Sequence, residues 1–242
     1  MTAIGILGSA GRMGRAIAAI AADLGAPIAG GIDAGGDPMP LAHDSDVLVD
    51  FSAPSALEAN LNAACTTNTP ILIGTTGLTR THHAMIDNAA ARIAVLQTGH
   101  TSLGVTLLAQ LVAQAAERLG PEWDIEIIEA HHRHKVDAPS GTAMMLGEAA
   151  SEARGLPLSE VSVVDRAGLA GARAEGTIGF AAIRGGSIAG DHKVLFAGPG
   201  ERLELAHHAE SREIFARGAV RGALWLAEQP AGRYRMSEVL GL

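Results

Sequence analysis

The chain contains 242 residues, 48% apolar and 18% charged, and its length and composition predict a folded globular protein of one or two domains. Its 30 glycines and 10 prolines are dispersed, and no repeat is visible, which excludes collagen-like, disordered and solenoid proteins. The formal net charge of −8 argues against general nucleic-acid binding, because phosphate backbones are held by an excess of Lys and Arg.

The sequence carries no sign of export or of a membrane segment. No apolar run approaches the roughly 18 residues that a bilayer-spanning helix needs, and the chain enters a strand pattern without a basic leader. The single cysteine, Cys65, cannot close an internal disulfide, and zinc sites that need two or more thiolates are excluded. We therefore expect a cytoplasmic protein.

The first hundred residues alternate short apolar runs with helical patterns. An apolar run at 3–7 leads through a glycine turn into a helix, and a second run at 27–32 closes on Asp33. Further strands are predicted at 47–51, 71–74 and 93–96, and helices at about 55–65 and after Thr79. This alternation predicts an α/β fold with a parallel, doubly wound sheet.

After Ser102 the pattern changes, and we place a domain boundary there. A long apolar helix is predicted at 103–119 and a strand at 124–129. Three later runs separated by glycines, at 177–183, 188–197 and 202–208, predict antiparallel hairpins. A final helix at about 212–228 is expected to pack on the first domain. The predicted domains are therefore 1–102 with 213–242, and a smaller α+β domain at 103–212 with a mixed or antiparallel sheet.

The glycine turn has the spacing Gly8-x-x-Gly11-x-x-Gly14 between a strand and a helix. In that setting backbone N–H groups can approach a pyrophosphate at a helix N-terminus. Asp33 follows Gly14 by 19 positions, close to the roughly 20 residues at which an acid binds an adenosine ribose. The pattern favours dinucleotide binding. The alternative is that the glycines serve helix–strand packing and Asp33 begins a turn.

Two loops follow predicted strands at the edge where open α/β sheets bind ligands. They read Gly74-Thr75-Thr76-Gly77 and Thr98-Gly99-His100-Thr101. Either loop can contribute to a ligand site or form a plain turn.

Residues 131–135 read His-His-Arg-His-Lys, a basic island that suggests a small anionic ligand. The run continues the predicted strand, so that His131, Arg133 and Lys135 share one face and His132 and His134 the other. A histidine can then transfer a proton near neutral pH beside a lysine that holds an anion. A solvated basic strand edge remains an alternative. We expect no metal, because the histidines are divided between faces and no carboxylate follows closely enough.

The next segment predicts a helix at 143–154 with Ser140 as its N-cap. The N–H groups of Gly141 and Thr142 would stay free, and a helix N-terminus beside a basic strand is suited to a carboxylate. Capping alone is the alternative.

Residues 131–143, His-His-Arg-His-Lys-Val-Asp-Ala-Pro-Ser-Gly-Thr-Ala, closely resemble the signature of the bacterial dihydrodipicolinate reductase (4-hydroxy-tetrahydrodipicolinate reductase) family of lysine and diaminopimelate biosynthesis. The resemblance covers essentially the whole chain, through the glycine turn, the loops at 50–54 and 74–77, and the last helix at 218–226. It implies a two-domain fold with a dinucleotide-binding domain and a substrate-binding and oligomerisation domain, a homotetramer, and reduction of a dicarboxylate by NADH or NADPH.

The resemblance also implies residue roles. His131 is the acid/base residue and Lys135 the second proton-donating residue. The implied substrate contacts are His132, Ser140, Gly141 and Thr142. The implied cofactor contacts are Gly8, Ser9, Ala10, Gly11, Arg12, Met13, Asp33, Gly74, Thr75, Thr76, Thr98, Gly99, His100 and Thr101.

One loop departs from the family. Gly99-His100-Thr101 stands where relatives usually carry Ala or Pro, then Asn, then Phe or Met. Two other functions therefore stay open: a nicotinamide-dependent reductase of a related cyclic imine dicarboxylate, and a catalytically weak dinucleotide-binding regulator. The presence of His131 and Lys135 favours an enzyme. Asp33, followed by Ala34-Gly35-Gly36-Asp37 without a basic residue, favours NADH modestly over NADPH, although Arg12 is expected within reach of a 2′-phosphate.

Overall fold

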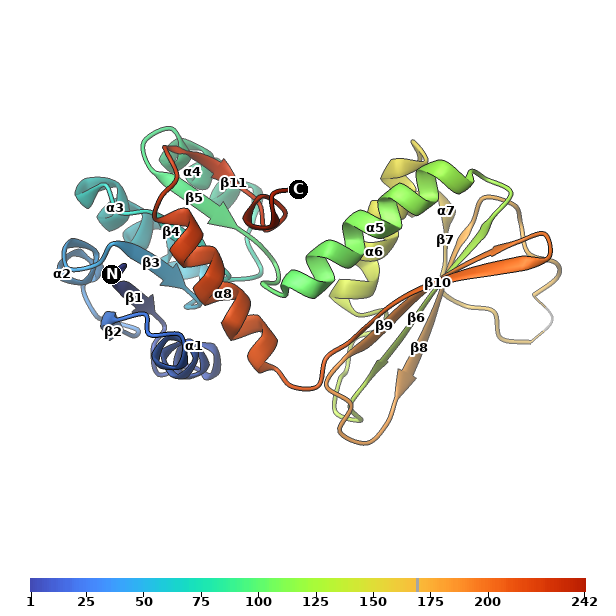
Figure 1. The fold of residues 1–242 in the computed structure, drawn as a ribbon, viewed down its shortest axis with the longest axis horizontal. Helices are drawn as coiled ribbons and strands as arrows, with labels where there is room; N and C mark the ends of the chain where they lie inside the picture. The colour runs from blue at the N-terminus through green and yellow to red at the C-terminus, as the bar shows by residue number, and fades with distance from the viewer. Residues whose placement is uncertain (169) are drawn as a thin grey trace. The chain divides into compact units, whose positions relative to one another are not determined.

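The computed structural model describes residues 1–168 and 170–242, which divide into two compact units (Figure 1). The first unit contains residues 1–103 and 213–242, so it is built from both ends of the chain, and the second contains residues 104–212. No helix in the described residues is both long and apolar enough to cross a membrane.

Within the described residues, the first unit has one parallel sheet in the order β11-β5-β4-β3-β1-β2. Its strands are β1 (Ile4–Leu7), β2 (Ile28–Ile32), β3 (Val47–Asp50), β4 (Ile71–Ile73), β5 (Ala94–Gln97) and β11 (Gly232–Tyr234). The predicted doubly wound sheet is confirmed. β11 was missed because its three residues, Gly-Arg-Tyr, carry no apolar run.

Helices cover both faces of this sheet. They are α1 (Arg12–Asp23), α2 (Pro38–His43), α3 (Leu57–Thr67), α4 (Arg80–Ala90) and α8 (Glu213–Leu226), with 3-10 turns η1 (Pro54–Ala56) and η2 (Glu238–Leu240). Alternate strand residues serve two apolar clusters: Ile6 packs with α1 and α8, and Leu7 packs with α2, α3 and α4. Burial on both faces explains why the strands are continuously apolar.

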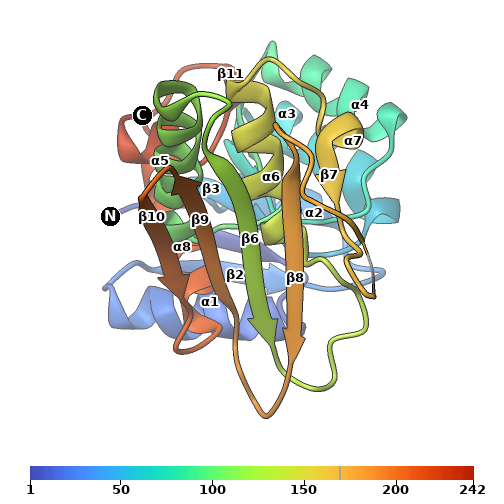
Figure 2. The same cartoon turned by 90° about the vertical axis from the view of Figure 1, so that its right-hand side faces the viewer.

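The second unit packs helices on one face of a mixed sheet in the order β10-β9-β6-β8-β7 (Figure 2). Its strands are β6 (Asp124–His131), β7 (Ser162–Val163), β8 (Ile178–Arg184), β9 (Asp191–Gly198) and β10 (Glu201–His208), and its helices are α5 (Leu103–Leu119), α6 (Gly141–Ala153) and α7 (Leu158–Val161). Ile125, Ile127 and Phe196 of the sheet are fully buried with apolar residues of α5 and α6.

One of the predicted hairpins is wrong. β9 and β10 form an antiparallel hairpin, but β8 and β9 do not pair, because β6 lies between them, parallel to β8 and antiparallel to β9. The link at 185–190 crosses the end of β6. In this position β6 has hydrogen-bonded neighbours on both edges, which satisfies the backbone of a strand with buried side chains.

The predicted continuation of the strand through residues 131–135 is also wrong. β6 ends at His131, and the Lys135 N–H donates to the carbonyl of His132 at 3.1 Å in a turn. Both neighbouring strands stop at the same level, since β8 ends at Arg184 opposite His131 and β9 begins at Asp191 opposite Ala130. Beyond His131 the described chain provides no strand to pair with, so the alternation of faces does not apply to residues 132–135.

Candidate active site

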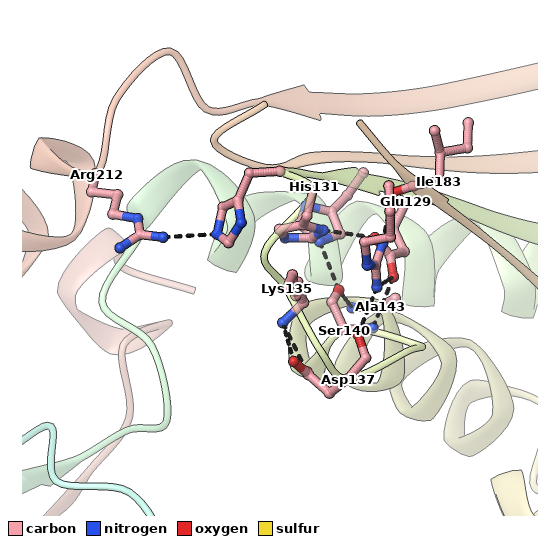
Figure 3. Close-up of polar contacts among 11 residues, drawn as sticks. Glu129, His131, Lys135, Asp137, Ser140, Ala143, Ile183 and Arg212 are labelled. Carbon is pink, nitrogen blue, oxygen red and sulfur yellow. Dashed lines mark hydrogen bonds and ion pairs between the residues drawn. The ribbon is translucent and has the colours of Figure 1, made fainter. Parts of the chain in front are cut away.

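The centre of the second unit's site is a buried carboxylate at the end of β6. Glu129 and His131 lie on the same face of the strand, and Oε2 of Glu129 is 2.6 Å from Nδ1 of His131 (Figure 3). Arg184, which pairs with His131 in the sheet register, donates to both carboxylate oxygens of Glu129 at 2.6 and 2.7 Å. The Glu129 side chain is 1% exposed.

The Glu129 carboxyl is held in its ionised form. Burial by itself raises the pKa of Glu129, but the hydrogen bonds and charges of Arg184 and His131 outweigh it, and the pKa lies below its usual value. An ionised carboxylate only accepts hydrogen bonds, so Nδ1 of His131 carries the hydrogen in this contact. In the described residues no hydrogen bond engages the other ring nitrogen, Nε2, and it is left for a ligand.

A second histidine packs against the first. The rings of His131 and His192, from β9, meet edge to face with centroids 5.1 Å apart. His192 is 5% exposed, and burial lowers its pKa to about 4, so it is neutral at pH 7. Its Nε2 lies 3.0 Å from Oγ of Ser140, which links β9 to the start of α6. His192 therefore packs on the His131 ring without adding a positive charge.

Ser140 is the N-cap of α6, as predicted: its Oγ accepts from the N–H of Ala143 at 3.1 Å. The Ser140 N–H donates to Glu129 at 3.1 Å, which ties the helix start to the buried carboxylate. The N–H groups of Gly141 and Thr142 make no hydrogen bond within the described chain. They stand at the positive end of the helix dipole, where a carboxylate is favoured.

Two further cationic groups flank this site. Nζ of Lys135 lies 2.8 Å from both carboxylate oxygens of Asp137, and this hydrogen bond lowers the pKa of Asp137 below its usual value. Arg212 donates to Nε2 of His132 at 3.0 Å, and desolvation together with the charge of Arg212 lowers the pKa of His132. Figure 3 shows His131, Lys135 and Ser140 around the end of β6 and the start of α6.

Sequence reasoning missed four residues of this site: Glu129, Arg184, His192 and Arg212. Glu129 had a local signal, because it stands two residues before His131 and shares its strand face. Arg184 comes from the end of β8, His192 from β9 and Arg212 from the last residue of the unit. These residues reach the site through contacts between distant segments, which no local sequence pattern contains. The described residues hold no cluster of three or more His, Cys, Asp or Glu suited to a metal ion.

In the first unit, the predicted cofactor residues follow the carboxyl ends of β1, β2, β4 and β5, which meet at one edge of the parallel sheet. β2 and β3 lie on opposite sides of β1, so the strand order reverses at β1. Open α/β sheets bind their ligands at the carboxyl ends of the strands beside such a reversal. Gly8 has a φ of 88°, and a Cβ at Gly14 would collide with the backbone of Gly8 and Ser9.

The start of α1 suits a pyrophosphate. Its N-cap is Gly11, the first turn holds no acid, and no side chain of the described residues caps it. Backbone N–H groups of Arg12 and Met13 therefore remain for an anionic ligand at the positive end of the helix. The Asp33 carboxylate accepts from Oγ of Ser9 at 2.8 Å and from the N–H of Ala10 at 3.0 Å, and so braces the glycine turn.

Several threonines of the predicted cofactor loops have their hydroxyls engaged within the protein. Thr75 donates to the buried Asp50 at 3.1 Å, and Thr101 donates to the carbonyl of Phe215 at 2.6 Å. Thr98 Oγ1 accepts from the N–H of His100 at 3.2 Å. Asp50, which also accepts from Ser52 and Asn60, joins the loops after β3 and β4. The hydroxyls of Thr75, Thr98 and Thr101 are therefore held within the protein, and the cofactor contacts stay predictions.

Comparisons with known proteins point to one family in both the N-terminal and the C-terminal part of the chain. The family model for the N-terminus of dihydrodipicolinate reductase matches residues 2–100, and that for its C-terminus matches residues 104–240. The 4-hydroxy-tetrahydrodipicolinate reductase of Zymomonas mobilis is 54% identical over 246 residues, covering 99% of this chain and 97% of the relative. That of Methylocella silvestris is 48% identical over 261 residues, covering 98% and 96%.

A solved structure has the same fold: a dipicolinate-bound dihydrodipicolinate reductase from Paenisporosarcina sp. TG-14 superposes with a TM-score of 0.76, at 22% identity and 97% coverage of both chains. Since the family models match both units, this chain belongs to the dihydrodipicolinate reductase family.

Proposed function

We propose that the chain reduces 4-hydroxy-tetrahydrodipicolinate to tetrahydrodipicolinate with NADH or NADPH, in lysine and diaminopimelate biosynthesis. Replacing the hydroxyl group by hydrogen consumes a hydride and a proton and releases water. The observation that carries the proposal is the arrangement of His131, whose Nδ1 is held by Glu129 while Nε2 is left for a ligand, at a helix start with free N–H groups. The family of the chain supports the same reaction.

In this proposal the second unit binds the dicarboxylate. The N–H groups of Gly141 and Thr142 and the ammonium of Lys135 would hold carboxylate oxygens, and charge-assisted hydrogen bonds of this kind are the stronger ones. His132 would contact the substrate from the same turn, with its Nε2 held by Arg212. His131 would hold and deliver the proton from Nε2, as a general acid does.

The first unit would bind the cofactor, whose nicotinamide supplies the hydride when bound. The turn from Gly8 to Met13 would hold the pyrophosphate, Asp33 the adenosine ribose, and the loops 74–76 and 98–101 would line the site. Asp33 retains acceptor capacity for ribose hydroxyls, because a carboxylate has about four lone-pair sites.

An assay of nicotinamide oxidation, with the substrate generated freshly by its synthase, tests the proposal. We expect loss of absorbance of the reduced nicotinamide that depends on the substrate. Cofactor binding without oxidation would instead support a dinucleotide-binding regulator. Because Gly99-His100-Thr101 departs from the family, the assay includes a related cyclic imine dicarboxylate, and faster turnover of that compound would replace the substrate proposed here.

Cofactor choice is expected to favour NADH by roughly tenfold in kcat/KM, which corresponds to about 1.4 kcal/mol. A 2′-phosphate would face the Asp33 carboxylate, which is fixed in place by Ser9 and Ala10, and residues 34–37 supply no basic side chain. Comparing kcat/KM for the two cofactors at fixed substrate measures the preference. A clear NADPH preference contradicts it, and Arg12→Ala would then show whether Arg12 binds the phosphate.

Assembly into a tetramer is expected through the sheet of the second unit. Ile128, Leu195 and Ile183 alternate with the buried core residues and so lie on the face opposite α5 and α6, and Ile183 is 52% exposed. A sheet face with such apolar side chains is rarely left in water. Light scattering should give a mass about four times the 24.7 kDa of one chain. A mass near that of one chain at assay concentration would refute this.

A further inference from the structure

We infer that Glu129, braced by Arg184, is a positioning residue that holds His131 in a single tautomer with Nε2 presented to the reacting substrate. The inference rests on the proposed function for its catalytic meaning, but the tautomer itself is a property of the protein without substrate.

The contacts of Glu129 leave its orientation little freedom. Oε2 meets Nδ1 of His131 at 2.6 Å, Arg184 binds both oxygens, and Oε1 accepts from the backbone N–H of Ser140 at 3.1 Å. A bidentate pair with a guanidinium fixes the carboxylate plane. Because the side chain is 1% exposed, water does not compete for these positions.

The ionised carboxylate determines which ring nitrogen of His131 carries the hydrogen. It has no hydrogen to donate, so the contact exists only when Nδ1 is protonated, and in the neutral ring Nε2 then bears the lone pair. In the protonated ring Nε2 carries the second hydrogen and can deliver it to substrate. The opposite tautomer would place two acceptors 2.6 Å apart, an uncompensated repulsion in a buried site.

The space at Nε2 is kept open by a glycine. A Cβ at Gly190 would lie 3.2 Å from Nε2 of His131, about where a hydrogen-bonded ligand atom would stand. The ring of His192 packs against the same ring in a T-shaped contact at a centroid distance of 5.1 Å and limits its rotation. Nδ1 is therefore anchored while Nε2 remains accessible, which is the arrangement that a proton-transferring histidine needs.

Glu129→Gln is the informative substitution because it keeps the size of the side chain. Oε1 of Glu129 accepts from both Arg184 and the Ser140 N–H, which only donate hydrogen bonds. The amide oxygen is therefore expected to take the Oε1 position, which leaves the NH₂ group facing His131. That group can only donate, and it favours a ring with the lone pair on Nδ1 and the hydrogen on Nε2. The substitution should therefore reverse the tautomer.

The first experiment observes the tautomer directly. The full chain is labelled with ¹⁵N in its histidine rings, and His131 is assigned by the signals lost in His131→Gln. At a pH where the ring is neutral we expect the Nδ1–H form in the wild type and a shift toward the Nε2–H form in Glu129→Gln. Glu126→Gln is the matched control, because Glu126 lies on the same strand, on the opposite face, and is also paired with arginines. It should leave the His131 signals unchanged.

Either of two results overturns the inference: a wild-type His131 in the Nε2–H form, or a Glu129→Gln spectrum with the wild-type tautomer. The wild-type measurement needs no variant, so it decides the question even if Glu129→Gln does not fold.

The second experiment is kinetic. Glu129→Gln should lower kcat by at least roughly 10- to 100-fold, the range seen when the hydrogen-bond partner of a metal-bound histidine is lost. In a His131→Gln background the same substitution should change kcat by less than about twofold, because there is no ring left to orient. A purely structural role predicts additive losses instead, and additive losses would remove Glu129 from this role.

The two proposals fail in different ways. If the wild type does not oxidise the cofactor with any dicarboxylate offered, the proposed function fails while the tautomer result stands. If the wild type is active and its His131 is in the Nε2–H form, this inference alone fails.

Discussion

Replacing His131 with Gln is expected to lower kcat by roughly 10²- to 10⁴-fold, the range that general acid–base groups contribute. His131 presents Nε2 at the proposed substrate site, and glutamine cannot take up and release a proton near neutral pH. The predicted cofactor contacts belong to the other unit, so KM for the reduced nicotinamide should stay within about twofold of the wild type.

Steady-state kinetics at saturating cofactor measure this effect, with thermal unfolding to confirm that the variant is folded. His134→Gln is the control, because His134 is exposed in the same basic turn and the site does not use it. Its kcat should match that of the wild type. Unchanged turnover in His131→Gln would exclude His131 from the mechanism.

Replacing Lys135 with Ala is expected to lower the rate by a comparable factor and to weaken binding of pyridine-2,6-dicarboxylate, a planar dianion that resembles the substrate. A hydrogen bond to a charged group contributes about 1.5–3 kcal/mol, which corresponds to roughly 10- to 100-fold in the inhibition constant. The pairing of Lys135 with Asp137 does not prevent this role, since Asp137 is 59% exposed and an exposed ion pair is worth little.

Two controls separate the binding role of Lys135 from loss of charge in general. Lys193→Ala removes the only other lysine, which pairs with Glu204, and should leave the inhibition constant unchanged. Asp137→Asn removes the partner of Lys135 but keeps the ammonium, and inhibitor binding should be equal or tighter. Equal inhibitor affinity in the wild type and Lys135→Ala would contradict the binding role.

The parts of the fold that were predicted correctly are those in which one short segment contains its own signal. The glycine turn between β1 and α1 is one, because its spacing and its apolar flanks are all local. Ser140 as the N-cap of α6 is another, since a cap needs only its own side chain and the N–H three residues later. The hairpin of β9 and β10 likewise depends on a two-residue connection.

The predictions that were wrong concern which segments become neighbours in the sheet. The pairing of β8 with β9 was wrong because β6 lies between them. The strand through 131–135 was wrong because β8 ends opposite His131 and β9 begins opposite Ala130. Strand order and strand ends depend on partners far away in the chain. No periodicity within β6 shows where its neighbours stop.

The sequence by itself determined the doubly wound sheet, the family and the residue types that can move a proton and hold a carboxylate. Only the tertiary structure decided how His131 is held, because Arg184 reaches Glu129 from 55 residues away and His192 comes from a third strand. Local patterns report interactions within a few residues, whereas a buried carboxylate needs charge and hydrogen-bond partners from wherever the chain brings them. The arrangement of Glu129, Arg184 and His192 around His131 therefore appears only when β6, β8 and β9 lie side by side.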